Sequence, residues 1–486
     1  MKEKYKKLLK NTTFLFISSF SSKVLIFLLV PLYTSVLSTQ EYGIYDLLYS
    51  VIQLVTPIFT LNIMESIFRF SIEESNNKKQ TFTIGIKYIV NSIVLIVVIA
   101  CILNYMYDIE FLGDYLIYSI LLYSIYVIHD MIIQFTRGLD KVKDISIAGV
   151  IETISMILLN ILFLIVLRRG LNGYFMAMIL SLSVPTIFLI IKNRLWQFVE
   201  FTKEIIKISD YEKQMIMYSL PLIFISLSWY INNVADRITV SVISGVEANG
   251  IYSISYKIPA ILNALQSIFV QAWQISAIKE YKSESKDEFY TKTYNACQII
   301  MVMFCSILIM LTKIIAKVLF AKEFYSAWEY VPILLIYIVF NTLSGTVGAI
   351  FSAAKDTKKL AMSGIVGAII NILLNIILVH KYNAMGAAIA TLISSIVIWA
   401  MRMIATREYI KLKIDYKSDI AQYIMLIIQS ICMMKIKSII LCYTVQLFFI
   451  VILVIINIIK VRRNKNVYKE NSYNRKFYIF YKKYKN

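Results

Sequence analysis

The chain has 486 residues, of which 59% are hydrophobic and only 16% charged, and its mean hydropathy is +0.69. Because soluble proteins carry about 25% charged residues, this composition excludes a soluble globular domain and indicates an all-α integral membrane protein. The chain has only two histidines, and its five cysteines lack CxxC spacing, so neither a metal site nor a disulfide framework is expected.

Fourteen apolar segments follow one another along the chain, and we expect each to form a transmembrane helix. Their ranges are 12–37, 43–70, 82–107, 111–134, 145–167, 174–191, 215–243, 251–278, 293–319, 331–354, 361–379, 386–401, 420–434 and 438–459. Cytoplasmic loops are enriched in Lys and Arg. With the N-terminus inside, 37 of the 50 basic residues fall in cytoplasmic segments and 6 in outer loops, which predicts that both termini are cytoplasmic. Arg168 and Arg169 are the main exceptions.

Two pairs of similar sequence segments divide the chain. ILLNI occurs at 157–161 and again at 372–376, and LSTQEYGIYDLLYS at 37–50 is similar to ISGVEANGIYSISY at 243–256. The nearly equal offsets, 215 residues for ILLNI and 207 for the GIY that the second pair shares, predict a six-helix unit that occurs twice. An even number of helices gives both copies the same orientation, with a site between them. We therefore expect two pseudo-symmetric lobes followed by two more helices; the ranges are 1–191, 215–405 and 406–459.

Two segments lie outside these helices. Between the lobes, 192–214 has apolar residues at helical spacing and is predicted to be an amphipathic helix on the inner membrane surface. The tail, 460–486, holds ten basic residues and one acid. We expect this tail to bind anionic membrane lipids rather than nucleic acid.

The first helix carries Lys23 near its middle, with Ser19 and Ser22 on the same face. A lysine ammonium at that depth is costly in lipid, so it is expected to face protein or water. In the second lobe, Asn233 and Arg237 belong to a corresponding polar stripe, which also includes Ser226 and Tyr230. These stripes predict the walls of a polar pathway through the membrane.

Other ionisable residues inside the predicted helices are functional candidates for the same reason. The cations are Lys23, Arg69, Lys87, Arg237, Lys257, Lys313 and Lys317, and the acids are Asp46, Glu65, Asp130, Glu152 and Asp236. Each has a structural alternative. Glu65 and Arg69, four residues apart, could form an ion pair, and Lys313 and Lys317 could reach the interface.

No feature of an enzyme stands out in the sequence. There is no GxxxxGK[ST] loop to hold ATP phosphates, so transport driven directly by ATP is not expected and no cofactor is predicted. The loops are too short to house a catalytic domain.

The stretches SSFSSKVLIFLLVPLYTSVLSTQEYGIYDL and MESIFRF, within a plan of two six-helix lobes and two further helices, resemble bacterial Wzx-type polysaccharide flippases. These belong to the multidrug/oligosaccharidyl-lipid/polysaccharide (MOP) exporter superfamily. The resemblance implies a MATE-like fold whose V-shaped cavity alternates between the faces of a bacterial cytoplasmic membrane. It implies a cargo of oligosaccharide on polyprenyl pyrophosphate for O-antigen, capsule or exopolysaccharide, with the polymerase and glycosyltransferases of the same pathway as partners.

Cationic residues line the cavity in that family, which assigns Lys23, Arg69 and Lys87 to it. The full set predicted for the substrate pathway is Lys23, Arg69, Lys87, Arg237, Lys257, Ser19, Ser22 and Asn233. The acids predicted to couple transport to an ion gradient or to the membrane potential are Asp46, Glu65, Asp130 and Asp236. A lysine can bind pyrophosphate as a point charge.

Three other functions stay open at this stage. A cation-coupled multidrug antiporter of the same fold would use the acids to exchange cations. A membrane glycan polymerase or glycosyltransferase would need a larger loop outside the membrane. A purely structural membrane protein would leave the cost of Lys23 in the bilayer unexplained.

If Lys23 binds the pyrophosphate, Lys23→Ala abolishes transport per inserted molecule, whereas Lys23→Arg keeps much of it because the charge is retained. Lys23→Glu is at least as damaging as alanine, because it repels phosphate. The measurement is transport normalised to the amount of protein in the membrane. Normal specific activity of Lys23→Ala would remove Lys23 from the pathway, and lowered abundance alone would assign it a structural role.

Overall fold

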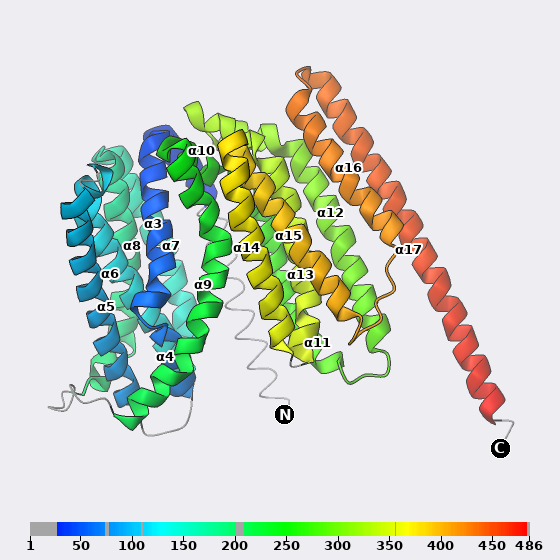
Figure 1. Ribbon diagram of the computed structural model, residues 1–486, viewed down its shortest axis with the longest axis horizontal. Helices are drawn as coiled ribbons and strands as arrows, with labels where there is room; N and C mark the ends of the chain where they lie inside the picture. The colour runs from blue at the N-terminus through cyan, green and yellow to red at the C-terminus, as the bar shows by residue number, and fades with distance from the viewer. Residues whose placement is uncertain (1–26, 73–76, 108–109, 201–208, 355, 484–486) are drawn as a thin grey trace. The chain divides into compact units, whose positions relative to one another are not determined.

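The computed structural model describes residues 27–72, 77–107, 110–200, 209–354 and 356–483, and these ranges contain helices and connecting turns but no strand (Figure 1). The α-helices are α2 (Val30–Val36), α3 (Thr39–Phe59), α4 (Ile63–Ile72), α5 (Lys78–Tyr107), α6 (Glu110–Gly138), α7 (Val142–Asn160), α8 (Gly170–Lys192), α9 (Asp210–Ser244), α10 (Val246–Ser255), α11 (Pro259–Glu280), α12 (Lys286–Leu319), α13 (Val331–Ala353), α14 (Thr357–Tyr382), α15 (Ala384–Thr406), α16 (Tyr416–Lys435) and α17 (Ile439–Lys483). Short turns of π- or 3₁₀-helix are η1 (Ile161–Val166), η2 (Leu195–Phe198) and η3 (Lys322–Glu329).

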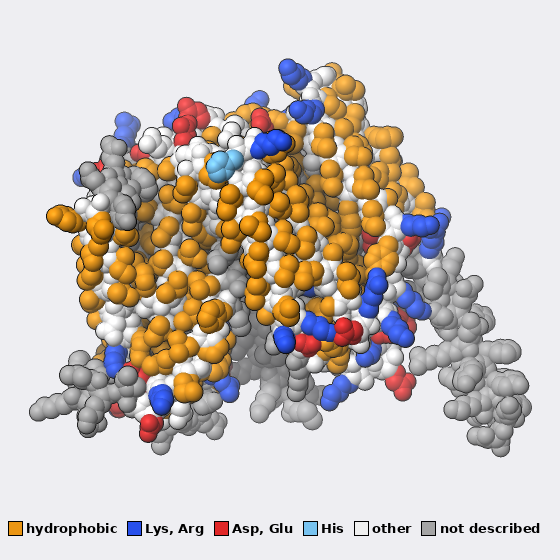
Figure 2. All heavy atoms as spheres, viewed as in Figure 1, with side chains coloured by type: hydrophobic (Ala, Val, Ile, Leu, Met, Phe, Trp, Pro, Cys, Tyr) orange, Lys and Arg blue, Asp and Glu red, His pale blue; other side chains and the backbone are white. Residues whose placement is uncertain are grey.

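Ten helical segments within the described ranges are long and apolar enough to cross a membrane. Their outer surfaces suit lipid, because hydrophobic side chains cover the middle of the helices while Lys, Arg, Asp and Glu gather near their ends (Figure 2). On α5, for example, Val90, Val94 and Val98 are each about half exposed. A contiguous apolar surface of this kind indicates a membrane-facing helix.

Two of the predicted helices are broken. The segment predicted as one helix over 43–70 begins earlier, because Ser38 and Glu41 form a capping box at the start of α3. It then breaks between α3 and α4, where Pro57 precedes Leu61 and Asn62, two residues in the left-handed conformation. The segment predicted over 251–278 breaks before Pro259, the first residue of α11.

The amphipathic helix predicted over 192–214 is also not continuous. Residues Leu195–Phe198 form one 3₁₀ turn, and Val199 is extended. Residues 201–208 lie outside the described ranges, and α9 begins at Asp210, where the Ser209 side chain accepts from the backbone N–H of Glu212. The described part of this segment is therefore a 3₁₀ turn followed by extended chain rather than an amphipathic α-helix.

The chain divides into two compact units, each with its own packing. Unit 1 comprises residues 1–257, 316–327 and 364–391, and unit 2 comprises 258–315, 328–363 and 392–486. The division into lobes at 192–214 stays a prediction.

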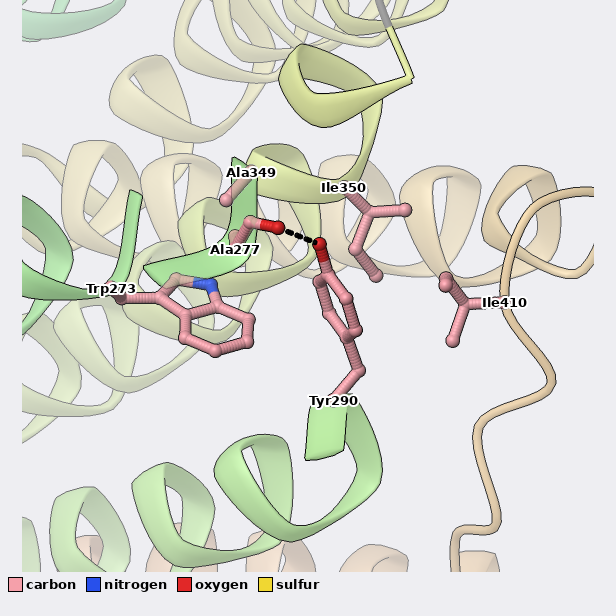
Figure 3. Close-up of a cluster of buried hydrophobic side chains, with 6 residues drawn as sticks. All are labelled: Trp273, Ala277, Tyr290, Ala349, Ile350 and Ile410. Carbon is pink, nitrogen blue, oxygen red and sulfur yellow. Dashed lines mark hydrogen bonds between the residues drawn. The ribbon is translucent and has the colours of Figure 1, made fainter. Parts of the chain in front are cut away.

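In unit 2, one buried hydrophobic cluster joins α11, α12 and α13 to the segment after α15; its members are Trp273, Ala277, Tyr290, Ala349, Ile350 and Ile410 (Figure 3). The polar groups of its two aromatic side chains both form hydrogen bonds. The Tyr290 hydroxyl donates to the Ala277 carbonyl oxygen at 2.7 Å, and the Trp273 indole donates to the Thr346 carbonyl oxygen at 2.8 Å. Buried hydroxyl and indole groups need such partners.

The last two helices of unit 2 are joined by a buried ion pair. Lys460 on α17, only 1% exposed, binds Asp419 on α16 and donates to the Gln298 side chain on α12 at 2.9 Å. Gln429 likewise connects α16 to Ser306 on α12 and to Gln446 on α17. Lys460 was counted in the lipid-binding tail, but its burial corrects that assignment for this residue.

In unit 1, α3 and α10 cross at two glycines from the similar segments 37–50 and 243–256. A Cβ on Gly43 would lie 2.0 Å from the carbonyl oxygen of Val246, and a Cβ on Gly250 would lie 1.9 Å from that of Thr39. Residues 39 and 43 are both 207 positions before 246 and 250, so the contact is reciprocal. The two similar stretches therefore pack against each other at this crossing through backbone that only glycine can bring so close.

Gly250→Ala is expected to destabilise the protein by at least about 1–3 kcal/mol, because the added methyl group meets backbone rather than a flexible side chain. Gly364→Ala on α14 is the matched control. A Cβ there meets nothing within 4 Å, so alanine should stabilise the helix by up to about 1 kcal/mol. Unfolding of the purified variants in detergent measures both. Equal behaviour of the two variants would contradict the close packing at Gly250.

Candidate functional site

A cavity of about 650 Å³ lies within unit 1, among α3, α4, α6, α7, α8 and α9. All six helices were predicted to lie in the membrane, and most of the side chains that line the cavity are polar or aromatic. Ligand sites are commonly clefts of about 300–1,000 Å³ with a few convergent polar groups. A polar cavity in a bundle of apolar helices is therefore the leading candidate site in this part of the chain.

The break between α3 and α4 forms one wall of the cavity. Thr56, Pro57, Thr60 and Asn62 line it, and the Asn62 side chain donates to Ser226 on α9 at 3.3 Å. Irregular backbone within a membrane is tolerated where it is buried in protein or lines a water-filled cavity. In transporters, interrupted helices mark substrate sites. The break thus points to the same site as the cavity.

The charged residues that line the cavity are acids. They are Glu65 on α4, Asp130 on α6 and Glu152 on α7. His129 lies beside them, 2.8 Å from the Thr186 hydroxyl through Nδ1 and 3.9 Å from Glu152 through Nε2. Asp130 accepts from Gln134 at 3.3 Å. No Lys or Arg is among the described residues that line the cavity.

Aromatic side chains form a further part of the lining. Tyr49 on α3, Tyr126 on α6 and Tyr230 on α9 all contribute. The rings of Tyr49 and Tyr126 meet edge to face, with centroids 6.1 Å apart. Such rings offer an apolar face and a hydroxyl that can donate or accept, so the cavity combines stacking surfaces with hydrogen-bonding groups.

Asp46 and Arg237, both predicted site residues, form a partly buried ion pair at the crossing of α3, α9 and α10, in which Asp46 is buried and the Arg237 side chain is 23% exposed. Arg237 donates to Asp46 at 2.9 Å and to Ser50 at 3.4 Å. Asp46 also accepts from Ser253 and Asn249 on α10. Because each charge has its counter-charge, this pair has a structural explanation that does not require a ligand.

Asp236 points to different partners from those of Arg237, as their adjacent positions on a helix require. It is 1% exposed, and it accepts from Asn375 at 2.6 Å, from Thr391, and from two tyrosine hydroxyls, those of Tyr252 and Tyr256. The buried Oδ1 of Asn375 has no hydrogen-bond partner in the part of the chain that the structure describes. Within the described ranges, no Lys or Arg forms an ion pair with Asp236.

The remaining predicted residues are dispersed. Lys87 on α5 binds Glu212 on α9 at 2.9 Å, so its charge is neutralised. Lys257, between α10 and α11, lies 6.0 Å from the centre of the Tyr42 ring, and Arg69 on α4 is exposed. Ser19, Ser22, Lys23 and the side chain of Asn233 lie outside the described residues.

Several residues of these sites were not predicted. Glu212 belongs to a segment treated as a linker, although its place just after Ser209 at a helix start was a usable signal. Asn375 is the asparagine of the second ILLNI, and a polar residue kept inside an apolar repeat could have marked it. Tyr230 was predicted as part of the polar stripe of the second lobe, whereas Tyr49 and Tyr126 carried no signal, because tyrosine is common throughout this chain.

Comparison with known proteins places the chain in a family. The polysaccharide biosynthesis protein family matches residues 8–275, more than half of the chain. The chain belongs to this family. An uncharacterized membrane protein of Methanocaldococcus jannaschii is 25% identical over 436 residues, which cover 82% of this chain and 97% of the relative. The family assignment confirms the predicted resemblance and the predicted link to polysaccharide biosynthesis.

Solved structures show the fold. A lipid II flippase, MurJ, in an inward closed conformation matches with a TM-score of 0.66 at 16% identity, covering 92% of this chain and 98% of that one. An inward-facing multidrug resistance MATE family transporter of the MOP superfamily matches with a TM-score of 0.59 at 15% identity, covering 79% and 94%. The protein thus has the fold of these structures, and its ten long apolar helical segments agree with a multi-pass membrane protein.

Proposed function

We propose that this protein is a flippase that moves oligosaccharide on polyprenyl pyrophosphate from the cytoplasmic to the outer face of a bacterial cytoplasmic membrane. The observation that carries the proposal is the polar, tyrosine-lined cavity beside a broken membrane helix in a polysaccharide biosynthesis protein. A saccharide headgroup needs such a hydrated, hydrogen-bonding space to leave the aqueous phase, while its lipid tail can stay in the bilayer.

The proposal includes an arrangement of fourteen membrane helices in two six-helix lobes plus two, with both termini cytoplasmic. The reciprocal contact of Gly43 and Gly250 supports a duplicated unit, since equivalent residues of the two copies meet. Movement of the lobes would open the cavity to one face at a time, and the basic residues outside the described ranges, Lys23 above all, would meet the pyrophosphate.

A second candidate is a cation-coupled multidrug antiporter of the same fold. The specific observation in its favour is the acid lining of the cavity by Glu65, Asp130 and Glu152, which suits a cationic guest. The family match favours the flippase, because the matched family is one of polysaccharide biosynthesis.

Deletion of the gene in the source organism distinguishes the two. A flippase predicts that surface polysaccharide falls while lipid-linked oligosaccharide accumulates on the cytoplasmic face, because early glycosyl transfer continues. Lectin labelling of intact and inside-out vesicles measures the distribution. Normal surface glycan in a strain with no second exporter, together with new sensitivity to lipophilic cations, would favour the antiporter.

Within the same proposal, Asp236 couples transport to an ion gradient. The donors to its buried carboxylate among the described residues are neutral, so gain or loss of a proton or of a small monovalent cation would change the local charge. We expect an imposed gradient to raise wild-type transport several-fold in proteoliposomes and to leave Asp236→Asn unaffected. Asp114→Asn, at an exposed position on α6, is the control. An equal response of Asp236→Asn and wild type would exclude this role.

A further inference from the structure

The charge of the cavity restricts what part of the cargo can enter it. A lipid-linked oligosaccharide has an anionic end, the pyrophosphate, and a saccharide end of variable charge. The cavity in unit 1 presents three carboxylates and no Lys or Arg among its described lining residues. Like charges in a partly desolvated space repel strongly, so the described lining of this cavity disfavours the pyrophosphate.

The geometry of the acids allows direct contact with a guest. Glu152 on α7 has a side chain that is 39% exposed, and Glu65 on α4 is also exposed, so both carboxylates are accessible to a guest. Asp130 on α6 accepts from Gln134 through Oδ1, which leaves acceptor capacity on its second oxygen. The three residues come from three different helices that wall the cavity.

The other lining groups suit a sugar. Sugar hydroxyls donate strong hydrogen bonds to carboxylates. The C–H face of a sugar ring can pack on the ring of tyrosine. Tyr49, Tyr126 and Tyr230 provide the rings, while the α3–α4 break adds Thr56, Thr60 and Asn62. The volume, about 650 Å³, lies within the range of small-molecule sites.

We propose that this cavity binds the saccharide end of the cargo and selects neutral or amine-bearing sugars over sugars that carry an acid group. This inference rests on the proposed flippase function and adds to it the chemical class of the cargo. Specificity arises by repulsion as well as by attraction, because a uronic acid would place a fourth negative charge among the three carboxylates.

The test uses the full chain in proteoliposomes at pH 8 with three probes. Each is a short polyprenyl pyrophosphate that carries a hexose, an amino-hexose or a hexuronic acid at the distal position of the same disaccharide. The initial rate of translocation is measured for each probe. We expect the hexose and amino-hexose probes to be translocated at least about tenfold faster than the hexuronic acid probe.

Two substitutions at one position then test the cause. Glu152→Gln should reduce the ratio of hexose to hexuronic acid rates, and Glu152→Lys should reduce it further or invert it. The readout is the ratio of rates, so a change in the amount of active protein does not affect it. Glu288→Gln and Glu288→Lys are the matched controls, because Glu288 is an exposed acid on α12 of unit 2. They should leave the ratio unchanged.

The outcomes separate the two levels of the proposal. Equal rates for all three probes, or a ratio that ignores both Glu152 substitutions, would overturn the sugar selectivity while the flippase function stands. Translocation of none of the probes by the wild-type chain would overturn the flippase function itself. If Glu152→Lys proves unfoldable, competition of free hexuronic acid and hexose disaccharides with transport by Glu152→Gln and wild type gives the same ratio, and equal inhibition by both sugars would contradict the inference.

Discussion

A buried carboxylate at the crossing of three helices is the interaction on which the packing of unit 1 depends. Asp46 accepts hydrogen bonds from Arg237 on α9 and from the side chains of Ser253 and Asn249 on α10. A charge at this depth is stable only if a counter-charge and hydrogen bonds replace the water it has lost. The same crossing brings Gly43 and Gly250 into backbone contact, so the ion pair and the glycines fix one geometry together.

Neutralisation of this kind divides the charges of the membrane helices into two groups. Lys87 with Glu212 and Lys460 with Asp419 are paired as Asp46 and Arg237 are, and these pairs connect helices. The acids of the cavity, by contrast, have no Lys or Arg beside them in the described lining. The number of cations and acids in the sequence is therefore a poor guide to the charge of the site, because pairing removes several of them from it.

Helices and membrane location could be predicted from the sequence, since they follow from local periodicity and composition, whereas the duplication stays a prediction. The glycines of the two GIY sequences lie in the pair of similar stretches found in the sequence. In the structure they allow the backbones of α3 and α10 to approach each other closely. The break after Pro57 was not predicted, because apolar residues continue across Leu61 and Asn62 and hide the change of backbone conformation. Contacts between residues that are distant in sequence could not be predicted either. No feature of the sequence near Lys87 indicates Glu212 as its partner, and none near Glu65 indicates that Glu152 lines the same cavity.

The central claim, that Asp46 and Arg237 stabilise the fold as a pair, is tested most directly by a double-mutant cycle of Asp46→Asn and Arg237→Gln. The quantity measured is the free energy of unfolding in detergent. Each single variant should be destabilised, and the double variant should lose less than the sum, with a coupling energy of about 1–3 kcal/mol. The exposed pair of Glu288 and Lys292 should give about 0.5 kcal/mol or less in the same cycle. Additive losses at Asp46 and Arg237 would contradict the claim.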